Sequence, residues 1–129
     1  MSAGWGRVVH APRWYCVVVG IFLAVRAVST LAAGANFALP GDGWRSVWQL
    51  LLVAVLAVGV ALPRAAWPAV AVVGAVYAVA TVLEVFQGAD LFGVVPVDMR
   101  DRIVHPLLAI VAALSLMLAG RRASVRSRD

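Results

Sequence analysis

Apolar residues fill four long stretches of this sequence, and most polar residues lie between them. The stretches cover about residues 14–34, 47–62, 65–86 and 103–120. A helix of about 20 residues crosses the roughly 30 Å hydrocarbon core of a bilayer. A backbone in lipid must satisfy its hydrogen bonds within its own segment, and the period-two alternation of a membrane barrel is absent. The pattern therefore predicts an all-α fold, an integral membrane four-helix bundle that forms a single domain over residues 1–129.

The segments that connect these stretches differ in length. The first, at 35–46, contains the Pro and Gly residues that are typical of a turn. The second, PRAAWP at 63–68, is so short that the helices on either side should be antiparallel neighbours. The third, at 87–101, is the longest. The tail at 121–129, RRASVRSRD, is polar and basic, and we expect it to be disordered.

Composition supports a membrane location. Hydrophobic residues make up 64% of the chain and charged residues 13%, whereas a soluble domain is about half apolar and about a quarter charged. A small soluble fold could not bury so much apolar surface. The net charge of +5 could suggest nucleic-acid binding, but basic flanks of membrane helices explain it better. We expect no nucleic-acid partner; the lipid bilayer is the expected environment.

The distribution of arginine predicts the orientation. With the N-terminus in the cytoplasm, seven arginines fall on the cytoplasmic side, namely Arg7, Arg13, Arg64, Arg121, Arg122, Arg126 and Arg128. Three fall outside, namely Arg45, Arg100 and Arg102. Cytoplasmic loops carry an excess of positive charge. We therefore expect a multi-pass protein of the cell membrane with both termini cytoplasmic and the segment around Asp98–Arg102 on the outer face.

A cleaved signal peptide is the alternative for the first stretch. Arg7 and Arg13 precede the apolar run, and LAAGA at 31–35 supplies the small residues of a cleavage site. Against this, the run is long for the apolar part of a signal peptide, and Arg26 interrupts it. The mass of the purified protein would decide between the two.

Two charged residues lie within apolar stretches. Arg26 interrupts the first stretch and Glu84 lies late in the third. A charge at the bilayer centre costs about 2.5–3.5 kcal/mol on insertion scales. With both termini inside, the two residues reach the outer half of the bundle, where we expect them to meet. Such a pair either fixes the packing register of two helices or faces a ligand or a proton path.

Charges are also crowded at the start of the last stretch, in VDMRDRIVHPLLAI at 97–110. If Asp98 caps a helix, Asp101 is its third residue, and both favour the positive end of the helix dipole. Asp101 and His105 are four residues apart, so we expect them to pair and to point into the bundle. Alternatively, the helix begins at Pro106 with His105 as its cap.

These charges have two functional interpretations. Exposed charge runs are usually solvated, so the segment could be a charged helix end in contact with water. The alternative is a polar site formed by Arg26, Glu84, Asp101 and His105.

The sequence contains no pattern that indicates catalysis or a cofactor. His10 and His105 fall on opposite sides of the membrane in this topology, so they cannot bind one haem iron together. No His or carboxylate cluster has the spacing of a metal site, and Cys16 is the single cysteine. Phosphate-binding loops and nucleophile elbows are absent. We expect no enzyme activity, no cofactor and no metal.

An Arg in the first span, a Glu late in the third and the segment LFGVVPVDMRDRIVHPLLAI at 91–110 together resemble the small four-helix DoxX-like membrane proteins. In particular they resemble actinobacterial relatives of unknown function, which carry a Pro-Val-Asn-x-x-Asp-x-x-x-His pattern before the last helix. The matching residues here are Pro96, Val97, Asp98, Asp101 and His105, with Asp98 in place of the usual Asn and Pro106 after the His. The resemblance implies a four-helix membrane protein linked to membrane redox or stress complexes, and it supplies no catalytic residues.

Three functions are compatible with these features. The first is an accessory or interaction subunit that binds a second copy of itself or a larger membrane complex. The second is a transporter of small solutes or protons that uses Glu84, Arg26 and His105. The third is a holin-like pore former, suggested by the small size and the basic tail.

Overall fold

The structure is a computed structural model that describes residues 10–128, with side chains described for residues 10–120. It contains four long helices: α2 (Ala11–Ala32), α3 (Asp42–Ala61), α4 (Ala66–Gln87) and α5 (Met99–Arg128). A short turn of 3-10 helix, η1 (Pro63–Ala65), joins α3 to α4, and a hairpin of β1 (Asp90–Leu91) and β2 (Val95–Pro96) joins α4 to α5. All four helices are long and apolar enough to cross a membrane. The prediction of an all-α fold is confirmed.

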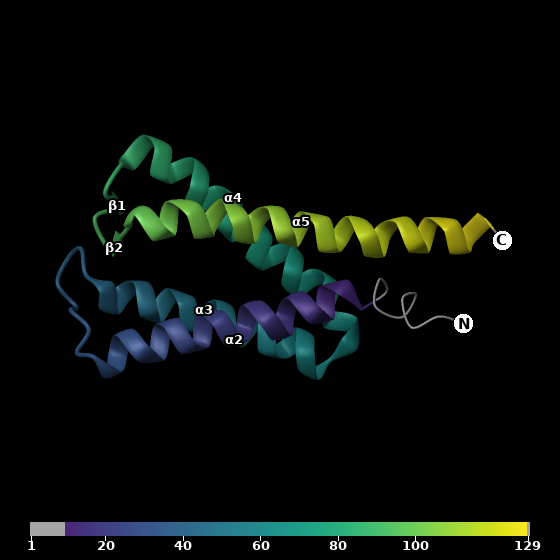
Figure 1. The fold of residues 1–129 in the computed structure, drawn as a ribbon, viewed down its shortest axis with the longest axis horizontal. Helices are drawn as coiled ribbons and strands as arrows, with labels where there is room; N and C mark the ends of the chain where they lie inside the picture. Colours follow the sequence, from purple (N-terminus) through teal and green to yellow (C-terminus); the bar gives the residue numbers. More distant parts are fainter. Residues whose placement is uncertain (1–9, 129) are drawn as a thin grey trace.

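The helices form two antiparallel pairs. α2 packs along α3 and α4 packs along α5, with further contacts between α3 and α4 and between α2 and α5 (Figure 1). The start of α2 and the end of α5 lie at the same end of the bundle. The loop between α2 and α3 and the β1–β2 hairpin lie at the opposite end, which we call the hairpin end.

Two helix ends differ from the prediction. α3 begins at Asp42 rather than near residue 47, and α5 begins at Met99 rather than near residue 103. The apolar pattern placed these starts too late because the first turns of both helices are polar. α5 also continues to Arg128, so the tail that we expected to be disordered is helical as far as that residue. Its Arg and Ala residues have high helix propensity, and no proline ends the helix.

Each helix buries one narrow stripe and exposes large apolar side chains elsewhere. The buried stripe of α2 contains Tyr15, Cys16, Val19, Leu23 and Ala27, at spacings of one, three and four residues. Large apolar side chains that face outward include Ile21, Val25, Leu51, Val79 and Leu114. A soluble bundle would present charged residues at such positions. Apolar outward faces on all four helices agree with lipid as the surrounding solvent.

Small residues allow close helix contacts inside the bundle. A Cβ atom on Gly74 of α4 would lie 2.7 Å from the Cβ atom of Ala112 on α5. A Cβ atom on Gly59 of α3 would lie 2.7 Å from the Cys16 sulfur of α2. These small residues are therefore used in packing within the chain.

The hairpin end is closed by backbone contacts between its two connections. The backbone N–H of Gly41, just before α3, donates to the carbonyl of Val94 in the hairpin at 3.0 Å. A side chain at position 41 would collide with the backbone carbonyls of Asn36 and Ala38. This glycine lets the α2–α3 loop fold tightly beside the hairpin, above the polar residues described next.

Candidate functional site

The polar site is built on the first turn of α5. Asp98 precedes the helix, and its side chain accepts a hydrogen bond from the backbone N–H of Asp101 at 2.9 Å. In return, the Asp101 carboxylate accepts from the backbone N–H of Asp98 at 3.2 Å. This reciprocal capping box confirms the expected cap. The alternative start at Pro106 is wrong: Pro106 lies inside α5, where it removes one helical hydrogen bond.

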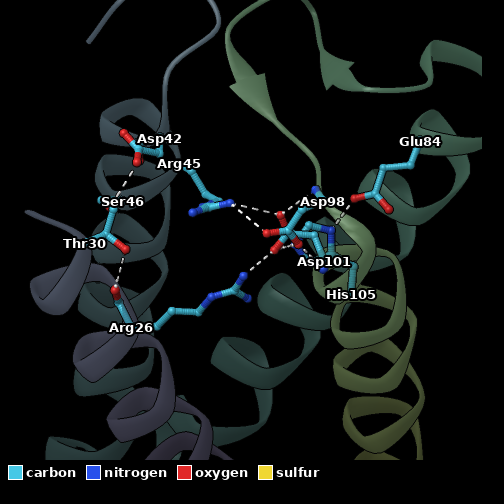
Figure 2. Close-up of polar contacts among 9 residues, drawn as sticks. All are labelled: Arg26, Thr30, Asp42, Arg45, Ser46, Glu84, Asp98, Asp101 and His105. Carbon is cyan, nitrogen blue, oxygen red and sulfur yellow. Dashed lines mark hydrogen bonds and ion pairs between the residues drawn. The ribbon is translucent and has the colours of Figure 1, made fainter. Parts of the chain in front are cut away.

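Two arginines from other helices converge on Asp101 (Figure 2). Arg26 of α2 donates from Nη2 to Asp101 Oδ1 at 2.7 Å, and Arg45 of α3 donates from Nη1 to Oδ2 at 3.2 Å. Arg45 also lies 3.6 Å from the carboxylate of Asp98. The Asp101 side chain is completely buried. One carboxylate therefore joins α2, α3 and α5.

The expected pair between Arg26 and Glu84 does not form. Arg26 binds Asp101, and Glu84 binds His105. Both charges do lie at the hairpin end, as their positions in the helices predicted. Their partners differ because Asp101 and His105 lie on the inward face of α5, where they meet α2 and α4 respectively.

His105 links α5 to α4. Its Nδ1 atom bonds to Oε1 of Glu84, and both side chains are almost fully buried. An ionised carboxylate can only accept, so in the arrangement with Glu84 ionised the Nδ1–H group donates to it. The second ring nitrogen, Nε2, lies 3.8 Å from Asp101 Oδ1 and has no hydrogen-bond partner. Asp101 and His105 therefore lie close together and are both buried, as expected, but they form no hydrogen bond with each other, because Asp101 binds the two arginines and His105 binds Glu84.

Aromatic rings surround His105. The rings of Trp48, Tyr77 and His105 contact one another with centroid distances of 5.1–5.5 Å. The Tyr77 hydroxyl and Gln49 Oε1 are buried and have no hydrogen-bond partner. Buried polar atoms without a partner are uncommon in folded proteins. The inner side of the site therefore has three unpaired polar atoms, contributed by α3, α4 and α5.

Sequence reasoning missed Arg45, Gln49, Trp48 and Tyr77. Arg45 was counted only as a charge of an outer loop, because the start of α3 was placed too late. Gln49 and Tyr77 are polar residues within apolar stretches, and that signal could have marked them. Their spacing of three or four from buried apolar residues, such as Leu52 and Val73, puts them on inward faces.

The charges at the hairpin end divide into a buried and an exposed group. Asp101, His105 and Glu84 are buried, whereas Arg100 and Arg102 are exposed and the Asp98 side chain is about half exposed, at 52%. Partial burial would raise the pKa of Asp98. The hydrogen bond from Asp101 and the attraction of Arg45 and Arg26 outweigh this effect and lower the pKa of Asp98. The interpretation as a helix end in contact with water therefore applies only to the exposed group, Asp98, Arg100 and Arg102.

The arrangement can hold four helices in register. Three carboxylates, two guanidinium groups and one imidazole form a continuous set of contacts across α2, α3, α4 and α5. Within the described residues, no group of three metal-binding side chains comes together.

Known proteins offer no guide to this site. No known protein family, no curated protein and no solved structure matches the chain. Function is therefore inferred from the chain's own residues.

Proposed function

We propose that this chain is a multi-pass protein of the cell membrane, with both termini cytoplasmic, that works as an accessory or interaction subunit. The tip of its β1–β2 hairpin would dock onto another membrane protein. The observation that carries the proposal is the placement of Phe92 at this tip.

Phe92 occupies a position that its side chain disfavours. The backbone N–H of Val94 donates to the carbonyl of Leu91 at 3.0 Å, which closes a turn with Phe92 and Gly93 at its centre. Both central residues have positive φ, +57° and +69°, as in the type I′ turns that favour Asn-Gly. A bulky residue with positive φ costs of order 1–3 kcal/mol, and such strain is concentrated at functional positions.

The strained side chain gains little from packing. Phe92 is 75% exposed, and Phe86, near the end of α4, is 82% exposed. Asn at position 92 would satisfy the turn and remove an exposed aromatic ring, so stability of the isolated chain does not explain Phe92. Aromatic residues are enriched in the centres of protein interfaces.

The transport hypothesis has weaker support. A solute or proton path needs polar groups through the thickness of the bundle. Among the described residues, the buried Asp, Glu and His side chains are Glu84, Asp101 and His105, all at the hairpin end. Apolar side chains, including Val19, Leu56 and Val70, fill the interior further from the hairpin. The polar site therefore lies at one end of the bundle only, which also argues against a pore through a single bundle.

Photocrosslinking tests the proposal. A benzophenone amino acid in place of Phe92 should form adducts with a protein in native membranes, whereas the same group in place of lipid-facing Leu114 should react with lipid. Exclusively lipid adducts at position 92 would mean that Phe92 is only an interfacial anchor.

The matched substitution is Phe92→Asn. It should preserve or raise the melting temperature, because Asn suits the turn. It should also abolish binding, in mild detergent, to the protein that crosslinks at position 92. A Phe92→Trp variant should retain the association. Loss of binding in both the Asn and the Trp variant would show that the partner does not recognise an aromatic ring at position 92.

A further inference from the structure

An apolar groove lies beside the polar site. It has a volume of about 560 Å³, within the usual range of ligand pockets. Its walls are formed by Trp48 of α3, by Val76, Val79 and Leu83 of α4, and by Leu91 and Phe92 at the hairpin. Every lining residue is Ala, Val, Leu, Phe or Trp. Because α3 and α4 are apolar enough to cross a membrane, an occupant would enter from the bilayer.

Trp48 connects this groove to the unpaired polar atoms of the site. It lines the groove, and its ring also packs against the rings of Tyr77 and His105 at 5.3 and 5.5 Å. The Tyr77 hydroxyl and His105 Nε2 have no partner, although both residues are 99% buried. Trp48 therefore contacts both the apolar groove and the two residues whose hydrogen-bonding atoms are unused, whereas neither Tyr77 nor His105 lines the groove itself.

The two buried tyrosines, Tyr15 and Tyr77, differ in whether their hydroxyl groups are hydrogen-bonded. The Tyr15 hydroxyl donates to the carbonyl of Leu108 at 2.9 Å. The Tyr77 hydroxyl has no such bond, and a buried polar group without a partner destabilises the fold. Phe at position 77 would fill the same space without this cost, so packing alone does not account for the hydroxyl.

We infer that the groove binds a membrane-soluble amphiphile with a hydroxyl-bearing headgroup. The apolar body lies along α4 beneath the hairpin. The headgroup passes Trp48, whose ring turns aside, and it reaches the aromatic cluster. There the ligand oxygen accepts from the Tyr77 O–H, and the ligand O–H donates to His105 Nε2, which is free to accept while Nδ1–H donates to Glu84. The inference rests on the membrane placement proposed above. Phe92 lines the groove, but the polar contacts that define the ligand, at Tyr77 and His105, do not involve it.

Trp48 fluorescence provides the test. The full chain, with Trp5, Trp14, Trp44 and Trp67 each replaced by Phe, is reconstituted into lipid nanodiscs. It is then titrated with a brominated fatty alcohol and with a brominated alkane of the same chain length. Bromine quenches tryptophan on contact, so saturable quenching reports occupancy of the groove. Failure to incorporate into nanodiscs would contradict the membrane placement itself.

The alcohol should bind more tightly than the alkane by about five-fold, the value of one or two net hydrogen bonds. Tyr77→Phe should lower that preference, because only the contact with His105 Nε2 remains, and it should not lower the melting temperature. The matched control, Tyr15→Phe, should keep the preference. Equal affinities for the two probes, or a preference as large in Tyr77→Phe as in the native sequence, would overturn the inference.

Discussion

The Asp101 carboxylate is fully buried and is neutralised by guanidinium groups from two other helices, Arg26 of α2 and Arg45 of α3. Its energetic role differs from that of Asp98, which touches Arg45 at 3.6 Å but is half exposed. Burial decides the difference, because water screens an exposed pair and cannot replace the partner of a buried one.

Asp101→Asn should therefore destabilise the bundle strongly. The substitution leaves Arg26 and Arg45 without their common anion, and breaking a buried pair costs about 3–5 kcal/mol. Asp98→Asn is the matched control and should cost less than about 1 kcal/mol. Denaturant unfolding in detergent micelles measures both values. Similar losses for the two variants would show that Asp101 does not hold the helices together.

Asp98 should make stability depend on pH. Its pKa is lowered in the folded protein, so its charged form stabilises the fold. That contribution is present above the unfolded value, about 3.9, and is lost as pH falls through the lower folded value. The difference in melting temperature between the native chain and Asp98→Asn should therefore shrink below about pH 4. A difference that stays constant from neutral to acidic pH would contradict this assignment.

Sequence could identify part of this site. Arg26, Glu84, Asp101 and His105 are conspicuous because charge is rare in apolar stretches, and all four lie at the hairpin end. Their pairing could not be predicted, because it depends on which inward face of α5 meets α2 and which meets α4. Arg45, Trp48 and Tyr77 join the site only through the rotation of α3 and α4 about their axes.

Among the elements, α4 and α5 depend on a close contact between small residues. Gly74→Ala places a methyl group 2.7 Å from the Ala112 Cβ atom, so the helices must separate. We expect a loss of about 1–3 kcal/mol from overpacking. Gly120→Ala is the matched control within α5, since a Cβ atom there has no neighbour within 4 Å. It should be neutral or stabilising by up to about 1 kcal/mol.

Thermal unfolding of both glycine variants in the same detergent would measure these effects. If Gly74→Ala is as stable as Gly120→Ala, α4 and α5 are not in tight contact at Gly74 and Ala112.

The elements were easier to predict than their ends. Continuous apolar runs identified all four helices, because no other regular structure satisfies its backbone in lipid over such lengths. The starts of α3 and α5 were placed too late, because their first turns are polar and are satisfied by contacts with other elements. Helicity of the segment after Gly120 was missed because composition alone suggested disorder.

At the scale of the whole molecule, an apolar exterior is combined with an ionic network at the hairpin end. The start of α2 and the end of α5 lie together at the opposite end (Figure 1). The excess of arginine near the termini leads us to place that end in the cytoplasm. The network, the groove and the hairpin tip would then all lie near the outer surface, where an extracytoplasmic domain or an outer-leaflet amphiphile can reach them.

Cysteine labelling in intact cells tests this placement most directly. Cys16 is the single cysteine, so a Cys16→Ser chain can carry one new cysteine, either Ala38→Cys in the α2–α3 loop or Ser124→Cys near the C-terminus. A membrane-impermeant maleimide should label position 38 in intact cells and position 124 only after the cells are permeabilised. Labelling of position 124 in intact cells, or of position 38 only after permeabilisation, would contradict the account.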